Sequence, residues 1–148
     1  MKEEACKRTP WHDPITQILE ATQSTQISGY PVYDRELLKS DLLKKGKNIT
    51  LIGDAAHPMS PFKGQGANQA LLDALSLARE ITRGCKSGSD WRKFGIRERV
   101  LNEFELEMIL RSSKKVEDSA KAAQLLHSDL VLRQANSPRG NALKTKVD

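Results

Sequence analysis

The chain of 148 residues has the length of one domain, enough to bury a hydrophobic core. Hydrophobic residues make up 38% and charged residues 29%, as in ordinary soluble proteins, and the net charge of +5 comes from basic residues interleaved with acidic ones. This pattern gives no sign of a nucleic-acid surface, and no apolar run is long enough to span a membrane. With two isolated cysteines, no signal sequence and no metal-ligand spacing, we expect a soluble, cytoplasmic protein without a metal site.

The N-terminal region is predicted to hold a short helix and an irregular strand. Asp13 and Pro14 suit the N-cap and the first position of a helix, and apolar residues follow them at helical spacing. Residues 30–33 place two tyrosines and a valine around Pro31, which favours an edge strand.

The middle of the chain is predicted to contain a buried strand and an amphipathic helix. Residues 49–52 form a short β-branched run that ends abruptly at Gly53. A helix is predicted after Gly66, with Gly84 as the residue that follows its last turn. The apolar face predicted for this helix comprises Ala67, Ala70, Leu71, Ala74, Leu75 and Ala78. A long helical pattern then runs from about residue 96 to about residue 127, with Ser112 and Ser113 as a candidate interruption.

The segment between that strand and that helix, LIGDAAHPMSPFKGQGAN, holds the candidate functional residues. A strand ending in Gly-Asp puts the carboxylate of Asp54 at the carboxyl end of a sheet, where open α/β folds bind ligands. Gly64 and Gly66 let the backbone approach a ligand, and the free amides of a helix N-terminus stabilise an anion by about 0.3–2 kcal/mol. That anion can be a diphosphate or the N1–C2=O edge of a reduced flavin, and physical reasoning alone does not decide between them.

The order Gly-Asp-Ala-Ala-His, Pro, Gly-Gln-Gly and Asn in this segment resembles the second flavin motif of the class A flavoprotein monooxygenases. This family includes hydroxylases of the salicylate and para-hydroxybenzoate type and the tetracycline-inactivating monooxygenases. Weaker similarity extends over most of the chain, through Trp11 and Pro14, the Tyr-Pro-Val-Tyr-Asp-Arg stretch at 30–35, Leu72-Asp73-Ala74, and Phe104-Glu105 ahead of Arg111.

The resemblance implies an oxidoreductase that uses FAD as cofactor and NAD(P)H as reductant, and that inserts one oxygen atom from O₂ into a small aromatic or polycyclic substrate. It assigns the carboxylate of Asp54 to the ribityl chain of FAD, Pro61 to the side of the isoalloxazine ring, and the amides of residues 64–68 to the pyrimidine edge of that ring. The cofactor-binding residues that it implies are Gly53, Asp54, Pro61, Gly64, Gln65, Gly66, Ala67 and Asn68. No catalytic residue is assigned.

The same resemblance implies an α+β, mostly helical fragment: the last strand and helix of a Rossmann-like FAD domain, a remnant of the substrate-domain sheet, and a long C-terminal helix. Residues 1–47 would end the substrate-binding domain, 48–84 would form the flavin-contacting strand, loop and helix, 85–127 the C-terminal helical region, and 128–148 a flexible basic tail. The GxGxxG motif and the Asp-Gly motif of the family are absent from the sequence. We therefore expect weak or no FAD binding by the chain alone, and a separate N-terminal half is a candidate partner.

Three other interpretations compete with the flavin site. Asp54 can be a simple loop cap, and Asp54, His57 and Ser60 can be read as a hydrolase triad, although a triad is defined by three-dimensional roles rather than by close spacing. The chain can also be a non-catalytic remnant whose long helix binds a partner.

Overall fold

The structure is a computed structural model that describes residues 1–10 and 13–132, so that Trp11 and most of the predicted basic tail lie outside the described residues. The chain divides into two compact units, Met1–Val32 and Tyr33–Asp148. We describe each unit by itself. Among the described residues, no helix is at once long enough and apolar enough to traverse a lipid bilayer.

The first unit contains two short helices, α1 (Lys2–Arg8) and α2 (Ile15–Ala21), followed by a 3-10 turn at Ser24–Gln26. The Lys2 ammonium joins them by donating to the carbonyl oxygens of Glu20 at 2.6 Å and Thr22 at 2.9 Å. The helix predicted after Asp13 is confirmed as α2. Its first helical residue is Ile15, because Pro14 occupies the N-cap position.

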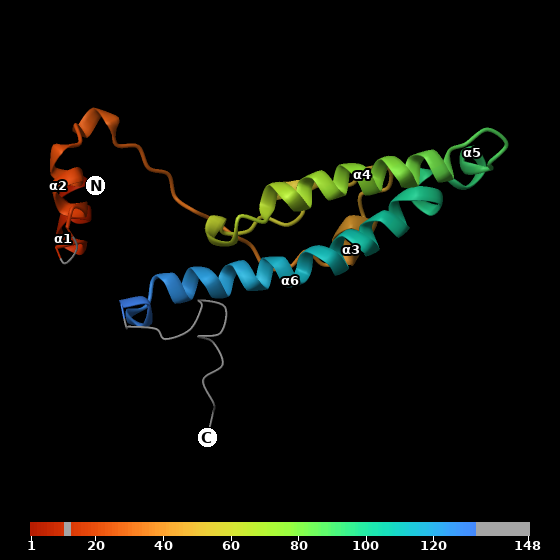
Figure 1. Ribbon diagram of the computed structural model, residues 1–148. Coiled ribbons are helices and arrows are strands. Elements are labelled where there is room, and N and C mark those ends of the chain that lie inside the picture. Colours follow the sequence, from red (N-terminus) through yellow and green to blue (C-terminus); the bar gives the residue numbers. More distant parts are fainter. Residues whose placement is uncertain (11–12, 133–148) are drawn as a thin grey trace, which may run out of the picture. The chain divides into compact units, whose positions relative to one another are not determined.

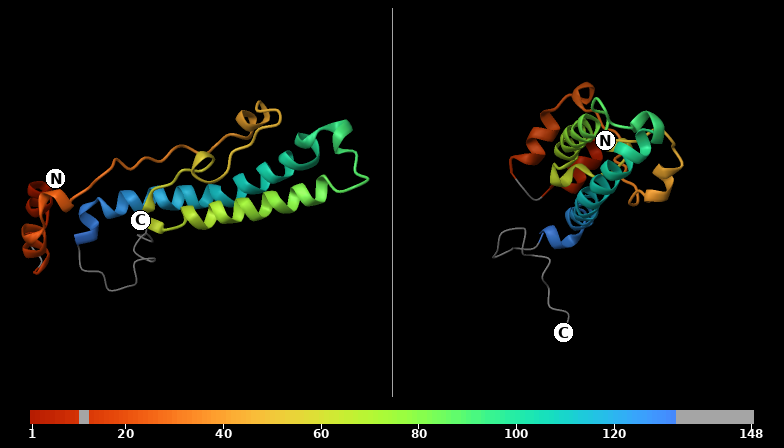
Figure 2. Two further views of the ribbon diagram at one scale, coloured as in Figure 1. Left: turned by 90° about the horizontal axis from the view of Figure 1, so that it is seen from above. Right: turned by 90° about the vertical axis from the view of Figure 1, so that its right-hand side faces the viewer.

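The second unit is built around an antiparallel pair of long helices, α4 (Gly66–Gly84) and α6 (Asn102–Leu126), which lie side by side in Figures 1 and 2. The short elements around this pair are α3 (Ser40–Lys44), α5 (Trp91–Phe94), 3-10 turns at Gly53–Ala55, Pro61–Lys63 and Asp129–Leu132, and a π-helical turn at Arg97–Leu101 that leads into α6. The predicted long helix is therefore confirmed, and it continues without a break through Ser112 and Ser113.

A small apolar cluster holds the second unit together. It consists of buried Leu43 from α3, Ala56 from the loop before α4, and Phe104 and Met108 from α6. Partly buried Leu38, Leu51, Leu77 and Ile109 pack against it. The cluster thus fixes the loop that contains Ala56 against the middle of α6.

The two predicted strands are wrong for the described residues, which contain helices and turns only. Residue Ile52 does have extended backbone, with φ −135° and ψ 162°. A strand also needs a neighbouring strand for its ladder hydrogen bonds, however, and the described part of the chain offers none. Tyr30 and Tyr33 are correspondingly 83% and 77% exposed. The mostly helical character was predicted correctly.

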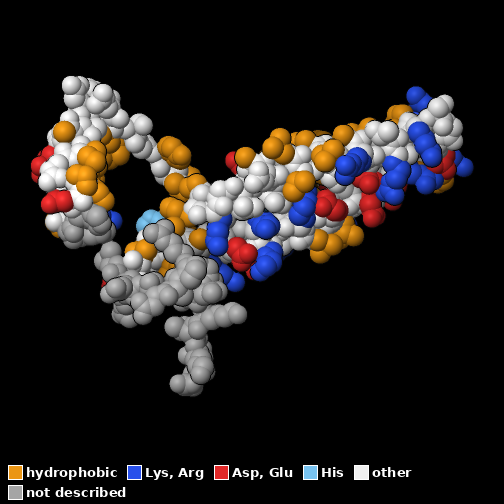
Figure 3. All heavy atoms as spheres, viewed as in Figure 1, with side chains coloured by type: hydrophobic (Ala, Val, Ile, Leu, Met, Phe, Trp, Pro, Cys, Tyr) orange, Lys and Arg blue, Asp and Glu red, His pale blue; other side chains and the backbone are white. Residues whose placement is uncertain are grey.

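The side of α4 that packs against α6 is polar. Leu71 and Leu75, on the predicted apolar face, are 70% and 47% exposed, while Gln69 and Asp73 are buried against α6. Figure 3 shows hydrophobic side chains along the outer edge of α4. The polar side is turned inward because its partners are the polar groups of α6 described below, which satisfy it.

The end of α4 lies closer to the next segment than the sequence indicates. Gly84 was predicted to follow the helix, whereas it is the last helical residue and Cys85 follows it. A Cβ atom on Gly84 would lie 2.5 Å from the carbonyl oxygen of Arg99 and 2.7 Å from a methyl group of Val100. Glycine is required here by close packing rather than by a left-handed backbone.

Candidate functional site

The loop that precedes α4 begins with a glycine in a conformation that other residues avoid. Gly53 has φ +57°, and a Cβ atom on it would lie 3.2 Å from the Cβ of Ala70. The chain then makes the 3-10 turn Gly53–Ala55, and the amides of Ala56 and His57 both donate to the carbonyl of Gly53 at 2.9 Å. We call residues 53–57 the aspartate loop, because this tight turn presents Asp54 at its outer side.

The Asp54 side chain is exposed and makes no hydrogen bond or ion pair with any residue that the structure describes. One of its carboxylate oxygens would lie 3.7 Å from a Cβ atom on Gly66, the first residue of α4. The alternative role of Asp54 as a loop cap would require its carboxylate to accept a backbone hydrogen bond. It accepts none from the described residues, so its acceptor sites are open to a ligand.

The second half of the predicted site is the N-terminal end of α4. Pro61 starts a 3-10 turn that ends at Gly64, which adopts the left-handed conformation with φ 60° and ψ 29°. No other group lies within 4 Å of a Cβ position on Gly64, so its surroundings are open. Gln65 occupies the N-cap position of α4 without a side-chain cap hydrogen bond, which leaves the first amides of the helix available. Ala67 and Asn68, in that first turn, are exposed.

The predicted cofactor-binding residues therefore occupy two adjoining turns, with Asp54 and Gly66 as their point of contact. A negative acceptor and a row of uncapped helix amides lie next to each other. A ligand that carries hydroxyl groups at one end and a developing negative charge at the other would match both.

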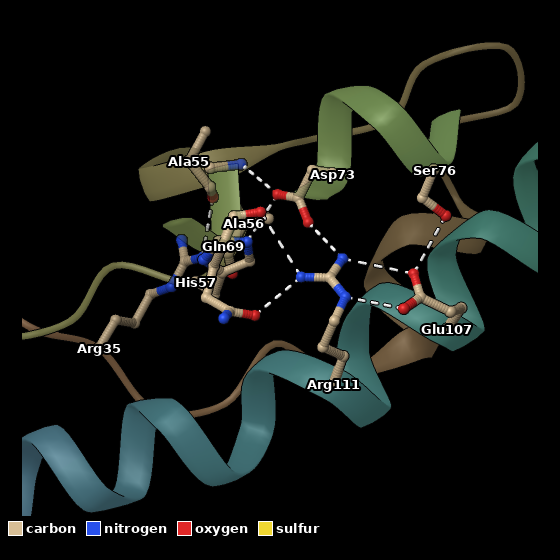
Figure 4. Close-up of polar contacts among 10 residues, drawn as sticks. Arg35, Ala55, Ala56, His57, Gln69, Asp73, Ser76, Glu107 and Arg111 are labelled. Carbon is tan, nitrogen blue, oxygen red and sulfur yellow. Dashed lines mark hydrogen bonds and ion pairs between the residues drawn. The ribbon is translucent and has the colours of Figure 1, made fainter. Parts of the chain in front are cut away.

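A buried carboxylate, Asp73 of α4, holds the aspartate loop in place (Figure 4). The side chain of Asp73 is fully buried, and its Oδ2 accepts from the amide of Gly53 and from Nε2 of His57, both at 2.7 Å. Because both ends of the loop donate to one oxygen, the carboxylate fixes the width of the loop.

The second oxygen of Asp73 is paired with Arg111 of α6, at 2.7 Å from Nη2. The same guanidinium donates to Oε1 of Gln69 at 2.8 Å and to Oε1 of Glu107 at 2.7 Å. Figure 4 shows Arg111 in the middle of these three partners. The polar inner face of α4 is thus matched by a planar cation that presents its donors in a fixed geometry.

The charges of this network reinforce one another. Burial by itself would raise the pKa of the Asp73 carboxyl, but hydrogen bonds from Arg111, from the Gly53 amide and from His57 outweigh burial and hold the pKa below its ordinary value of 3.8. Burial would likewise lower the pKa of Arg111, but pairing with Glu107 and Asp73 raises it. Asp73 and Arg111 are therefore a charged pair at neutral pH.

A third anchor comes from Arg35, whose Nη2 donates to the carbonyl oxygens of Ala55 and Ala56 at 2.9 Å each. The segment just before the loop is held by Arg97 of the π-helical turn, which donates to the carbonyl oxygens of Lys47 and Ile49 and pairs with buried Glu105 at 2.8 Å. Arginines therefore anchor both the aspartate loop and the segment that leads into it.

The hydrolase triad is excluded by these contacts. His57 pairs with Asp73 rather than with Asp54, and Ser60 donates its hydroxyl proton to the carbonyl of Ser119 at 2.8 Å. The buried Nδ1 of His57 has no hydrogen-bond partner among the described residues. His57 borders a cavity of about 10 Å³, far smaller than a flavin pocket, so the open outer side of the loop is the candidate cofactor surface.

Sequence reasoning identified the two turns of the candidate surface but missed the network behind them. Asp73, Arg35 and Arg111 received no role beyond their place in a family pattern, and Gln69 received none. The available signal was a polar pair at positions 69 and 73, one turn apart among the alanines and leucines of the first half of α4.

Comparison with known proteins places the chain in a family. A family model described as FAD binding domain matches residues 6–92, more than half of the chain. The chain therefore belongs to this family of FAD-binding domains, and the resemblance to class A FAD-dependent aromatic monooxygenases is confirmed. FAD is the cofactor that this membership implies.

Curated monooxygenases and hydroxylases are similar to this chain over part of their length. The aurachin C monooxygenase/isomerase of Stigmatella aurantiaca is 45% identical over 69 residues, which cover 47% of this chain and 17% of that protein. The FAD-dependent monooxygenase phnB of Penicillium herquei is 40% identical over 79 residues, covering 53% and 18% respectively. The phenazine 1,6-dicarboxylic acid hydroxylase PhzS of Lysobacter antibioticus is 48% identical over 60 residues, covering 40% and 14%. The chain thus spans less than a fifth of these relatives. No solved structure matches it significantly.

The residues present fit FAD as a ligand of this surface. The unpaired carboxylate of Asp54 suits the ribityl hydroxyls, and the uncapped amides at the start of α4 suit the electron-rich pyrimidine edge of a flavin. The open space at Gly64 leaves room for a flat ring against the backbone.

Proposed function

We propose that this chain supplies the flavin-contacting loop of an FAD-dependent monooxygenase that uses NAD(P)H and O₂ to hydroxylate a small aromatic or polycyclic substrate. The observation that carries the proposal is the exposed, unpartnered carboxylate of Asp54 beside the uncapped N-terminus of α4. Family membership supports FAD, and the names of the relatives support hydroxylation of aromatic compounds. Bound FAD would supply the redox chemistry, and the protein would supply orientation and charge.

In this proposal each part of the surface has its own task. Asp54 accepts hydrogen bonds from the ribityl hydroxyls and so fixes the cofactor along its length. The amides of residues 65–68 donate to the pyrimidine edge, where they stabilise negative charge; the Gly64 amide already donates to the carbonyl of Pro61 at 3.0 Å. Pro61, on the rim of the same turn, borders the ring. Gly53 lets the chain turn tightly enough to bring Asp54 beside Gly66.

We also propose that the dinucleotide-binding part of the enzyme covers the outer face of α4. Leu71 and Leu75 are exposed in the middle of that face, and Ile49 and Ile52 are 68% and 42% exposed just before the aspartate loop. Exposed apolar residues gathered on one helix favour a protein partner over water. The partner expected there is a βαβ unit that holds the ADP moiety of FAD.

A chimera tests the proposed function. The segment of the aurachin C monooxygenase that matches this chain is replaced by the corresponding segment of this chain, and FAD content and NAD(P)H oxidation are measured. We expect the chimera to retain FAD, and Asp54→Ala to weaken FAD binding by about 1–3 kcal/mol, or roughly 5- to 150-fold. The control Asp41→Ala removes an equally exposed carboxylate on α3 and should have no effect. Equal FAD retention in both variants would refute the assignment of Asp54.

The second candidate is a non-catalytic interaction module. It is favoured by Leu106 and Leu110 of α6, which are 54% and 69% exposed and lie one turn apart. A chimera that folds, holds no FAD and oxidises no NAD(P)H would support this candidate over the enzyme.

A further inference from the structure

Asp54 is the one residue of the aspartate loop that no side chain of the described residues holds. The amide of Gly53 and the imidazole of His57 both bind Asp73, and the carbonyls of Ala55 and Ala56 both bind Arg35. The Asp54 carboxylate is exposed and has no partner among the described residues.

The oxygen that anchors the loop belongs to Asp73, whose buried negative charge needs a positively charged partner. Asp73 is 0% exposed, and its second oxygen is neutralised by Arg111, which reaches it from α6, 38 residues further along the chain. Without the guanidinium, a charged Asp73 would be buried with only the Gly53 amide and the His57 ring as donors. The loop contacts therefore depend on a residue from a different helix.

We infer that Arg111 is a positioning residue of the FAD site: through Asp73 it holds the aspartate loop in the shape that presents Asp54 to the cofactor. This inference rests on the proposed function of Asp54. A site organised before the ligand arrives binds without a further ordering cost, which is the advantage of such a pair. Neither Arg111 nor Asp73 needs to touch FAD.

A simpler role for Arg111 would be to join α6 to α4. Its hydrogen bond to the Gln69 side chain serves that purpose, whereas its bond to Glu107 stays within α6. The two roles differ in what a substitution disturbs. A helix staple affects both helices together, whereas a positioning residue affects the amides of the aspartate loop first.

The test is amide hydrogen exchange of the full chain, followed by NMR. Arg111→Gln is expected to accelerate exchange of the Gly53 amide about 10-fold or more relative to the helical amides of α4, because this amide donates directly to the charged Asp73. The His57 amide donates to the Gly53 carbonyl and should be accelerated less. Arg111→Lys, which keeps the charge, should give an intermediate acceleration. Arg83→Gln is the matched control, because Arg83 is an ion-paired arginine on α4 that contacts Glu80 and not the loop.

Unchanged exchange at Gly53 in Arg111→Gln would overturn the inference. If Arg111→Gln fails to fold, Arg111→Lys decides: selective acceleration at Gly53 supports the inference, and uniform or absent acceleration overturns it. FAD affinity of the chimera, measured in parallel, separates the two proposals. Loss of affinity in Asp54→Ala with an undisturbed loop in Arg111→Gln would leave the proposed function standing and remove the positioning role. Faster exchange in the loop of Arg111→Gln, together with unchanged FAD affinity in Asp54→Ala, would remove the proposed function and leave Arg111 as the residue that holds the loop.

Discussion

Removing the guanidinium of Arg111 is expected to destabilise the second unit strongly. In Arg111→Met, the fully buried Asp73 carboxylate keeps only the Gly53 amide and His57 as donors. Breaking a buried pair in this way costs about 3–5 kcal/mol, mainly because the remaining charge is left uncompensated. The methionine replaces much of the aliphatic volume, so lost packing adds little.

Removing the charge of Asp73 instead should reduce the free energy of unfolding by less. In Asp73→Asn, Arg111 keeps its bonds to Glu107 and Gln69 and is itself 19% exposed, so we expect a loss of about 1–3 kcal/mol. The double variant should be more stable than the sum of the single losses implies, because neither partner is then left charged and unpaired.

Urea unfolding followed by circular dichroism at pH 7 measures these differences. The urea concentration at the midpoint of unfolding should fall in the order wild type, Asp73→Asn, Arg111→Met, with little change in the dependence of the unfolding free energy on urea concentration. Arg83→Gln serves again as control, because its pair with Glu80 lies at the surface and should contribute about 0–1 kcal/mol. An Arg111→Met variant as stable as the control would refute the argument that the pair is buried and coupled.

Three further predictions concern acid, packing and solubility. The pKa of Asp73 in the folded protein lies below 3.8, so its contribution to stability is complete above that value and is lost as the pH falls through the folded pKa. In Asp73→Asn, the free energy of unfolding should therefore depend less on pH below about pH 4. An unchanged pH dependence would contradict this. Gly84→Ala should destabilise by about 1–3 kcal/mol, seen as a lower melting temperature, because its Cβ would meet the Arg99 carbonyl at 2.5 Å. Leu71→Glu with Leu75→Glu should reduce self-association in sedimentation without lowering helix content; lost helicity would show that this face is part of the core.

The long helices and the two glycine-containing turns before α4 were predictable because their signals are local. Helical spacing after Gly66 and after residue 96 identified α4 and α6, and the Gly-Asp and Gly-Gln-Gly pairs identified the two turns. The order of these motifs also sufficed to name the family, which the comparison with known proteins confirmed.

The interior of the second unit was not predictable because it depends on pairs far apart in sequence. Apolar periodicity identified the face of α4 that carries Leu71, but it gave no sign that the chain buries the opposite side through Asp73 and Arg111. The strand at 49–52 failed for a related reason, because its propensity is real but pairing needs a second strand that the described residues do not contain. The roles of the predicted cofactor-binding residues remain predictions.

The central claim is that the turn between residue 53 and α4 receives the flavin ring and the ribityl chain. The most direct measurement is a crystal structure of the chimera with FAD bound. We predict that an oxygen of Asp54 lies within hydrogen-bond distance of a ribityl hydroxyl and that the amides of residues 65–68 face the pyrimidine edge. A flavin bound elsewhere, touching neither Asp54 nor the start of α4, would contradict the account.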